Sequence, residues 1–217
     1  MTPGSTDDTQ TQAEVQQTYD RIGQHFSRTR DVAWPEIEEF CETVTGDRAI
    51  DLGCGNGRHL ELLSDTAEEL LGVDISRVLL REAITRARNK GYSIDPIQAD
   101  VISLPIQAAT IDIGIYIATL HHLSSRHKRV GSLNEFARIL RPNSQGIISV
   151  WSIHHERFDR SEGFDTYIDW TLPNGETVPR FYHIYDSAEF KSEIRDSNLV
   201  LQESYVSSGN CFAEITI

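Results

Sequence analysis

Residues 49–58 read AIDLGCGNGR, and this stretch decides the fold. Its apolar first half is typical of a short buried strand, which runs directly into a loop with a glycine at every second position. The glycines let the backbone turn tightly and let a ligand approach it closely. The spacing of Leu60, Leu62 and Leu63 predicts a helix after the loop, with free backbone amides that would point at that ligand.

A second apolar strand is predicted at residues 69–73, and it ends in Asp74. An acid at the tip of the second strand of such a fold binds the hydroxyls of a nucleotide ribose. A dinucleotide fingerprint would have its third glycine at position 58, but this loop has Arg58 there and its third glycine at Gly57. The loop also lacks the Gly-Lys-Ser/Thr of a phosphate-binding Walker loop. A plain glycine turn in an α/β domain explains the loop less well, because it leaves Asp51 and Asp74 unexplained.

Length and composition favour one folded domain at residues 13–217, preceded by a disordered tail at residues 1–12. No apolar run approaches the roughly 18 residues of a membrane span, and no secretory signal opens the chain, so we expect a cytoplasmic protein. The three cysteines are far apart in the sequence and indicate neither a disulfide framework nor a metal site.

The formal net charge is −13, with 33 acidic residues and lysine only at Lys90, Lys128 and Lys191. Such a surface repels nucleic acid at low salt. We therefore hypothesise a salt-rich cytoplasm, as in a halophilic archaeon, where ions screen the repulsion. An RNA substrate would have to be held by local arginine clusters or with the help of a partner.

Strands and helices alternate from residue 48 onward, which predicts a mostly parallel sheet with helices on both faces. Two helices, at residues 13–26 and from Trp34-Pro35 onward, precede the sheet and are expected to lie over the site. Pro142 is expected to end the helix that Ser124 or Ser125 caps, and residues 154–180 are expected to form a long loop. The remaining predictions are helices after Ser76 and Asp186, strands at 94–99, 111–117 and 146–151, and an antiparallel hairpin at 199–217.

Ligands bind at the carboxyl ends of the strands in open α/β sheets. We therefore expect His121 and Trp151, which end the fourth and fifth strands, to share one crevice with Gly53 and Asp74. Simpler roles are available for each candidate: His121 can merely end its strand and Trp151 can belong to the core. Arg30 and Arg180 can be ordinary surface charges.

The pattern Asp-x-Gly-x-Gly-x-Gly resembles the first motif of class I methyltransferases, which bind S-adenosylmethionine. The resemblance places Asp74 on the ribose and Asp100 beside the adenine. The cofactor-binding residues that it implies are Asp51, Gly53, Cys54, Gly55, Asn56, Asp74, Ile75, Asp100, Val101 and Ile117.

Further motifs resemble the tRNA wobble-uridine methyltransferases: YDxIGxHFSxTRxxxWP at 19–35, IAxxHHLS at 117–124, LRP at 140–142, VW at 150–151 and RFYH at 180–183. This resemblance implies transfer of a methyl group to the carboxylate of 5-carboxymethyluridine. It also implies a heterodimer with a small zinc-binding activator subunit. This chain departs from the family pattern in two places. At the final hairpin Ser207-Ser208 and Cys211 replace an expected Asp-Arg pair and a Trp, so the RNA contacts or the modified base can differ. After the Pro of LRP, Asn143 replaces the usual glycine, and asparagine can also adopt a positive φ.

A carboxylate acceptor is already ionised near neutral pH, since its pKa is about 4, and it needs no general base. Arg30 and Arg180 are our candidates for positioning it, because a guanidinium meets a carboxylate with two hydrogen bonds. His121 and Tyr182 would act as neutral donors, and Trp151 and Trp34 would stack on the uracil ring. If the acceptor were instead a phenol or an amine, His121 would be a plausible base.

Two other functions stay open at this point: a small-molecule O- or N-methyltransferase, and a non-catalytic module that a partner stabilises. For the activator we expect a docking site on the edge strand at residues 94–98, because an edge exposes unpaired backbone groups. Leucines beside that edge could add apolar surface, although on periodicity alone the core of this chain is the better assignment for most of them. They are Leu70, Leu71, Leu79 and Leu80.

Overall fold

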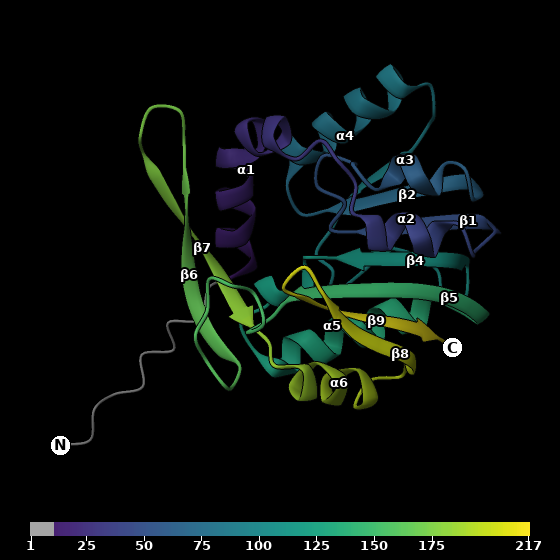
Figure 1. Ribbon diagram of the computed structural model, residues 1–217. Helices are drawn as coiled ribbons and strands as arrows, with labels where there is room; N and C mark the ends of the chain where they lie inside the picture. The colour runs from purple at the N-terminus through teal and green to yellow at the C-terminus, as the bar shows by residue number, and fades with distance from the viewer. Residues whose placement is uncertain (1–10) are drawn as a thin grey trace.

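The computed structural model describes residues 11–217, so the tail expected at residues 1–12 lies almost wholly outside the described part of the chain. A seven-stranded sheet forms the centre, in the order β3-β2-β1-β4-β5-β9-β8, with helices on both faces (Figure 1). This arrangement confirms the expected class I methyltransferase fold. The strands of the sheet are β1 (Gly46–Leu52), β2 (Ala67–Asp74), β3 (Asp95–Gln98), β4 (Ile111–Ile117), β5 (Leu140–Trp151), β8 (Val200–Ser207) and β9 (Asn210–Thr216).

The first five strands pair in parallel, and β9 joins β5 in the antiparallel direction as half of a hairpin with β8. Because parallel strands end at one edge of a sheet, the residues that follow β1, β2, β4 and β5 are brought together there. The helices are α1 (Gln12–Thr29), α2 (Pro35–Cys41), α3 (Leu60–Leu63), α4 (Arg77–Lys90), α5 (Arg126–Ile139) and α6 (Ser187–Arg195), with a 3₁₀ turn η1 (Leu120–His122).

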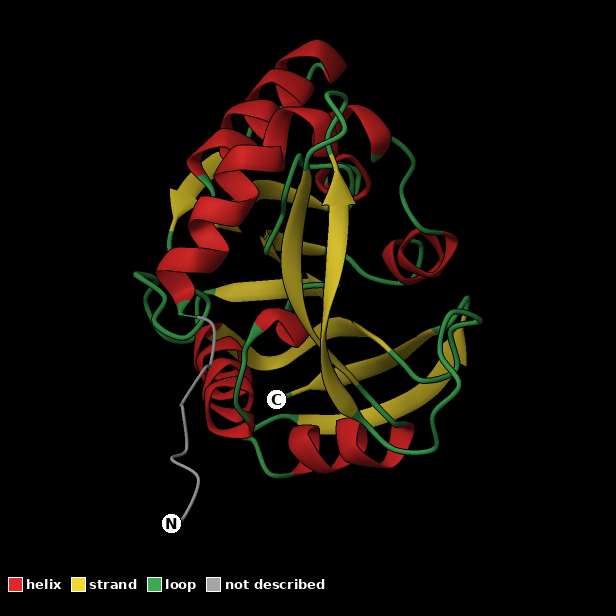
Figure 2. Cartoon of the chain, turned by 90° about the vertical axis from the view of Figure 1, so that its left-hand side faces the viewer, coloured by secondary structure: helices red, strands yellow, loops and turns green. Residues whose placement is uncertain are grey.

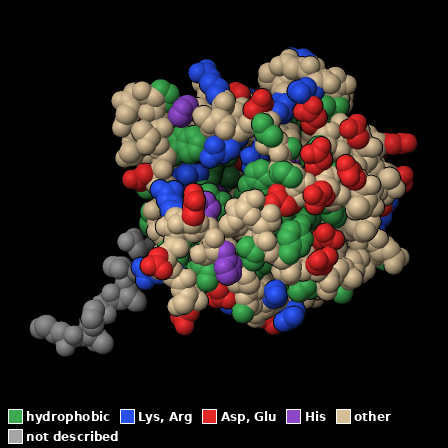
Figure 3. All heavy atoms as spheres, in the orientation of Figure 1, with side chains coloured by type: hydrophobic (Ala, Val, Ile, Leu, Met, Phe, Trp, Pro, Cys, Tyr) green, Lys and Arg blue, Asp and Glu red, His purple; other side chains and the backbone are tan. Residues whose placement is uncertain are grey.

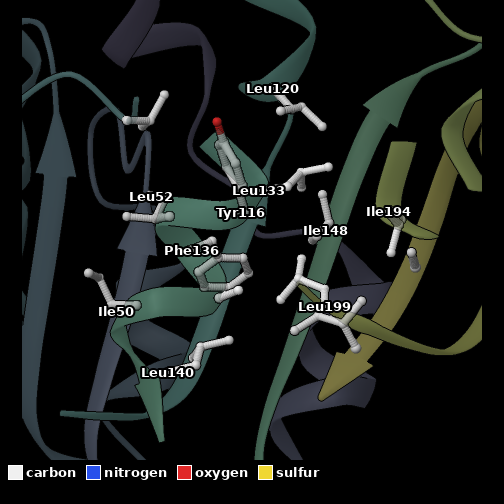
Figure 4. Close-up of a cluster of buried hydrophobic side chains, with 14 of the residues drawn as sticks. Ile50, Leu52, Tyr116, Leu120, Leu133, Phe136, Leu140, Ile148, Ile194 and Leu199 are labelled. Carbon is white, nitrogen blue, oxygen red and sulfur yellow. The ribbon is translucent and has the colours of Figure 1, made fainter. Parts of the chain in front are cut away.

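The larger part of the core lies between the sheet and helices α5 and α6 (Figure 4). Phe136 is its centre, fully buried, and its ring lies so close to Gly114 of β4 that any side chain there would collide with it. Tyr116 is also fully buried, and its hydroxyl is hydrogen-bonded to Ser132 at 2.7 Å, so no polar group is left unsatisfied by its burial. A second cluster packs α2 and α3 on the opposite face.

Most predicted helix boundaries are confirmed by their caps. The side chains of Ser76, Ser125 and Asp186 accept backbone N–H groups at the starts of α4, α5 and α6, and Gly91 ends α4 with a φ of 86°. Asn143 takes a positive φ of 66°, as expected where the related family has glycine.

The helix predicted after the glycine loop is α3, and it is only four residues long. The hydroxyls of Ser64 and Thr66 bond to the backbone carbonyls of Glu61 and Leu63 and compete with further helix. One expected helix end is wrong. Pro142 does not end α5. That helix stops at Ile139, and Pro142 lies inside β5, which begins at Leu140.

The loop expected at residues 154–180 is also wrong, since most of it is a hairpin. Strands β6 (Phe164–Thr171) and β7 (Thr177–Ile184) pair with each other outside the main sheet and run beside α1 (Figures 1 and 2). Buried and exposed residues alternate at the end of β6, where Ile168 and Trp170 face inward. The Asn174-Gly175 pair in the connection is typical of a hairpin turn, and it is the sequence signal that was overlooked.

Strand β3 is an edge of the sheet, as predicted. The prediction of an apolar surface beside β3 is wrong, because the leucines expected to form it are all buried in the core of this chain: Leu70, Leu71, Leu79 and Leu80. Among the described residues, no helix is long and apolar enough to cross a membrane.

Candidate active site

A first cavity, which we call the loop cavity, lies where β1, β2 and β4 end beneath α1. It is lined by nine of the ten residues predicted to hold a cofactor, from Gly53 to Ile117, together with Tyr19 and Phe26 of α1. The exception is Asp51, which is buried just before the loop and does not line the cavity. The Oδ2 atom of Asp51 has no hydrogen-bond partner in the described chain, and burial raises the pKa of this carboxyl to about 8.

The backbone of the glycine loop is shaped for a close ligand. Gly53 has a φ of 72°, and a side chain there would collide with Thr119. Gly55 has a φ of 56°, and a Cβ there would meet only the ring of Phe26, at 3.8 Å. A side chain at Gly55 would therefore occupy open space in the cavity, which is the space that a ligand needs.

Asp74 is buried at the end of β2, and both of its oxygens already hold the backbone. Oδ2 accepts the N–H of Gly55 at 2.8 Å and Oδ1 accepts that of Ser76 at 2.8 Å. Burial raises the pKa of Asp74 to about 6, although these backbone donors act in the opposite direction. Each carboxylate oxygen has a further lone pair, so Asp74 can still accept the hydroxyls of a ribose. The loop, Asp74 and the half-buried Asp100 together fit a nucleoside cofactor.

Asn56 links the glycine loop to the end of α1. Its side-chain nitrogen donates to the backbone oxygens of Arg30 at 2.7 Å and Ser27 at 3.2 Å. This amide therefore holds the segment that carries Arg30 in place over the loop. A role in fixing α1 accounts for the side chain of Asn56 without any contact to a cofactor.

A second cavity, which we call the aromatic cavity, adjoins the first. Its walls include Arg30, His121, Trp151, Arg180 and Tyr182, which are all five candidate acceptor-site residues, and also Trp34. We expected one crevice, but the structure has two adjoining cavities: Gly53 and Asp74 line the first, and His121 and Trp151 line the second. The two cavities share the following wall residues: Tyr19, Phe26, Arg58, Ala118 and His122.

His121 is neutral and its tautomer is set by the backbone. The N–H of Trp151 donates to Nδ1 of His121 at 3.1 Å, so in the neutral ring the proton lies on Nε2. Burial and the neighbouring His122 and Arg180 hold the pKa of His121 well below its usual range. In this state His121 can donate a hydrogen bond from Nε2, but it has no free nitrogen with which to accept a proton.

His122 is likewise engaged at both nitrogens. Its Nδ1 donates to the carbonyl oxygen of Phe181 at 2.8 Å, and its Nε2 lies 2.8 Å from the hydroxyl of Tyr19. Burial lowers the pKa of His122 to about 3. Since a carbonyl can only accept, the neutral ring accepts the proton of Tyr19, and this bond joins α1 to the end of β4.

Arg180 is a buried cation, only 6% exposed, without a carboxylate partner. Its guanidinium lies 5.0 Å from the ring of Trp170 and 5.1 Å from that of Tyr182, and no acid of the described chain forms an ion pair with it. Its Nε has no hydrogen-bond partner. Arg30 lies over the same Trp170 ring at 5.3 Å. Buried charges normally have a partner of opposite charge, so two arginines without an acidic partner beside one ring indicate a binding site for an anion.

Flat rings line the wall next to Arg180. Trp151 stacks on Tyr182 with their centroids 5.0 Å apart, and Tyr182 lies 4.9 Å from His121. A planar base could extend such a stack. Figure 3 shows that arginine and lysine side chains gather around a hollow on this face, whereas acidic side chains spread over the right-hand side.

Sequence reasoning missed four residues of the site: Tyr19, Arg58, His122 and Trp170. Tyr19, Arg58 and His122 stood inside motifs that were already recognised. Trp170 could be placed only once the β6–β7 hairpin was known. In the part of the chain described, no group of three or more His, Cys, Asp or Glu side chains could hold a metal ion, and all three cysteines are buried free thiols.

Comparison with known families finds the Methyltransferase domain family at residues 50–148. The mouse tRNA (carboxymethyluridine(34)-5-O)-methyltransferase ALKBH8 is 36% identical over 146 residues, covering 67% of this chain and 21% of that protein. The Saccharomyces cerevisiae tRNA (carboxymethyluridine(34)-5-O)-methyltransferase is 34% identical over 174 residues, covering 78% of this chain and 60% of that protein. The chain therefore spans less than two thirds of either relative.

Solved structures share the fold at lower identity. An S-adenosylmethionine-dependent methyltransferase from Clostridium acetobutylicum has a TM-score of 0.71 at 14% identity, covering 94% of this chain and 98% of that one. A Haloferax volcanii protein solved in complex with the Trm112 methyltransferase activator has a TM-score of 0.68 at 17% identity, covering 93% of this chain and 96% of that one.

Proposed function

The chain belongs to the tRNA carboxymethyluridine methyltransferase family, and we propose that it uses S-adenosylmethionine to methyl-esterify the carboxylate of a carboxymethyl-type wobble uridine in tRNA. The observation that carries this proposal is the unpaired, buried guanidinium of Arg180, which lies beside stacked aromatic rings and next to the loop cavity. A carboxylate on a planar base satisfies both features. The reaction would take place in the cytoplasm, where tRNA is modified and used.

The loop cavity holds the cofactor, which supplies an electrophilic methyl group when it is bound. Gly53 and Gly55 would leave room for its amino-acid half, Asp74 would accept the ribose hydroxyls and Asp100 would hold the adenine side. The neighbouring Ile75, Val101 and Ile117 give this end of the cavity its apolar walls. Tyr19 and Phe26 of α1 form part of the wall that this cavity shares with the aromatic cavity.

The aromatic cavity positions the acceptor. Arg180 and Arg30 orient the carboxylate, and Nε2–H of His121 and the hydroxyl of Tyr182 are the neutral donors beside it. Burial holds the pKa of Tyr182 well above its usual range, so this phenol keeps its proton at neutral pH. Orientation and removal of water are the contributions required of these residues, since the acceptor arrives already ionised.

The rate of methyl transfer should not depend on a histidine base. Nδ1 of His121 and both nitrogens of His122 are engaged, and neither ring has a free acceptor. At saturating cofactor and substrate we expect the rate to vary by no more than about twofold between pH 6.5 and 8, because no group with the usual histidine pKa of about 6.5 takes part. The pH profile of His121→Ala should keep the same shape at a lower rate. A rate that rises with such a pKa, and loses that rise in His121→Ala, would instead assign base catalysis to His121.

We also propose that a small zinc-binding methyltransferase activator docks on β3, making a heterodimer. Support comes from the open edge, since β3 pairs only with β2 in the described chain, and from the Haloferax volcanii neighbour, which has this fold and was solved in complex with the Trm112 methyltransferase activator. Pro96 withholds one donor from that edge, but its neighbours are free to accept another strand.

Hydrogen exchange tests the docking site. The backbone amides at residues 94–98 should exchange quickly in the isolated protein and at least about tenfold more slowly in the complex, because strand addition protects edge amides. Strand β8 at the opposite edge is the internal control, and its exchange should not change. We also expect the isolated chain to be poorly soluble. A soluble monomer that is fully active alone would remove the need for the partner.

A further inference from the structure

Arg58 is a third arginine of the aromatic cavity, and nothing so far gives it a role. It follows the glycine loop directly and lines both cavities. Its guanidinium lies 5.1 Å from the ring centroid of Trp34. Trp34 lines only the aromatic cavity, so this stacking places the charge of Arg58 on the acceptor side of the shared wall.

Arg58 is half-buried and has no carboxylate partner within the described residues. The acids of the same cavity are engaged elsewhere: Asp31 pairs with Arg86, and Glu36 accepts the hydroxyl of Ser208. Burial and the charges of Arg30 and Arg86 lower the pKa of Arg58 to about 10, although the buried Asp51 acts in the opposite direction. An anion that binds beside Arg58 would stabilise its charge against the neighbouring arginines.

A nucleotide within an RNA chain carries a second kind of anion besides a carboxylate on its base. Phosphodiester groups flank it on both sides, and arginine is well suited to bind them. Arg180 lies in the cavity wall with the stacked rings, where the base and its carboxylate would bind. Arg58 lies instead against Trp34, with the exposed Arg28 also at this cavity.

We propose that Arg58 binds a backbone phosphate next to the modified nucleotide, so that the enzyme selects RNA over the free nucleoside. This assignment rests on the proposed function, because it takes an RNA chain as the ligand. Such a contact supplies affinity and register and carries no sequence information. It would also explain how a chain of net charge −13 holds a polyanion, through a local group of arginines.

The test measures binding as well as catalysis. The probes are two tRNA anticodon stem-loops that differ only at the phosphates flanking the wobble uridine, which are ordinary in one and neutral methylphosphonates in the other. The proteins are wild type, Arg58→Gln, Arg58→Lys and a control, Arg88→Gln. Arg88 is exposed on α4 outside both cavities, so the control changes net charge equally.

Wild type should bind the ordinary stem-loop about tenfold more tightly than the neutral one, and Arg58→Gln should bind both alike, with Arg58→Lys intermediate. The slope of log affinity against log salt should fall by about 0.7 in Arg58→Gln and stay unchanged in Arg88→Gln. Cofactor affinity should remain normal, and the loss of transfer should lie in KM rather than kcat.

Three results would overturn the assignment. A wild type that does not distinguish the two stem-loops excludes the phosphate contact, whatever its methyl transfer activity. The phosphate contact would also be excluded if Arg58→Gln lost affinity equally for both stem-loops. A fall in cofactor affinity in Arg58→Gln would place this guanidinium on the carboxylate of S-adenosylmethionine instead. Failure of the proposed function alone would appear differently, as normal phosphate-dependent binding without ester formation.

Discussion

Replacing Arg180 by glutamine is expected to reduce methyl transfer to carboxymethyluridine tRNA by about a hundredfold or more, which corresponds to about 2.7 kcal/mol of transition-state stabilisation. Arg180 is 6% exposed and has no acidic partner in the described chain, so the acceptor carboxylate would be its counter-ion. Loss of a buried, charge-assisted pair has effects of this size. Single-turnover transfer with saturating cofactor measures the change.

The matched control is Arg160→Gln. Arg160 is exposed and also lies over an aromatic ring, that of Phe164 at 5.2 Å, but it lines neither cavity. The Arg160→Gln variant should therefore transfer the methyl group at the wild-type rate. Arg180→Gln should keep normal cofactor affinity, because Arg180 does not line the loop cavity. Full activity in Arg180→Gln would refute the role of this residue in binding the acceptor.

Replacing Asp74 by alanine is expected to weaken S-adenosylmethionine binding by about tenfold or more, at least about 1.4 kcal/mol. Asp74 supplies the acceptors for the ribose, and it also holds the amides of Gly55 and Ser76. Calorimetry measures the affinity. Unchanged affinity would rule out the assignment of Asp74 to the cofactor.

The pH dependence of binding separates the two roles of Asp74. Its pKa lies at about 6 in the protein, raised by burial, so lowering the pH from 7 to 5 protonates it. The ionised form accepts hydroxyls better, and cofactor affinity should therefore fall over this range in wild type. In Asp74→Asn, which does not titrate, affinity should already be low and should stay constant. A wild-type affinity that does not change with pH would contradict direct contact.

The sequence was most informative where a residue's role depends on its local backbone. Helix α4 begins after Ser76 and ends at Gly91, as predicted. The alternation of apolar strands with helices correctly predicted a parallel sheet whose strands end at one edge. Because the strands end at one edge, their order alone predicts that Gly53, Asp74 and His121 lie close together, and they line neighbouring cavities. Glycine loops and caps are local geometry, and they can be recognised without the rest of the fold.

Prediction failed where tertiary contacts decide the structure. Residues 164–184 have weak periodicity, and their hairpin is held by packing of Trp170 and Val178 against Ile22 of α1. The Asn174-Gly175 turn could have indicated the hairpin, but the placement of Arg30 and Arg180 beside Trp170 depends on its packing against α1 and could not be predicted. The engagement of His121 by the N–H of Trp151 was equally hidden, because it joins the ends of two strands that are 30 residues apart in sequence.

The central claim, that the acceptor is the carboxylate of a wobble uridine, is tested most directly by mass spectrometry of nucleosides. Transfer RNA carrying 5-carboxymethyluridine is incubated with the protein, its activator and S-adenosylmethionine, then digested. The account predicts conversion of that nucleoside to its methyl ester, which mild alkali returns to the free acid. A methyl group that resists alkali, or one found only on a small molecule while the carboxymethyluridine is unchanged, would contradict it.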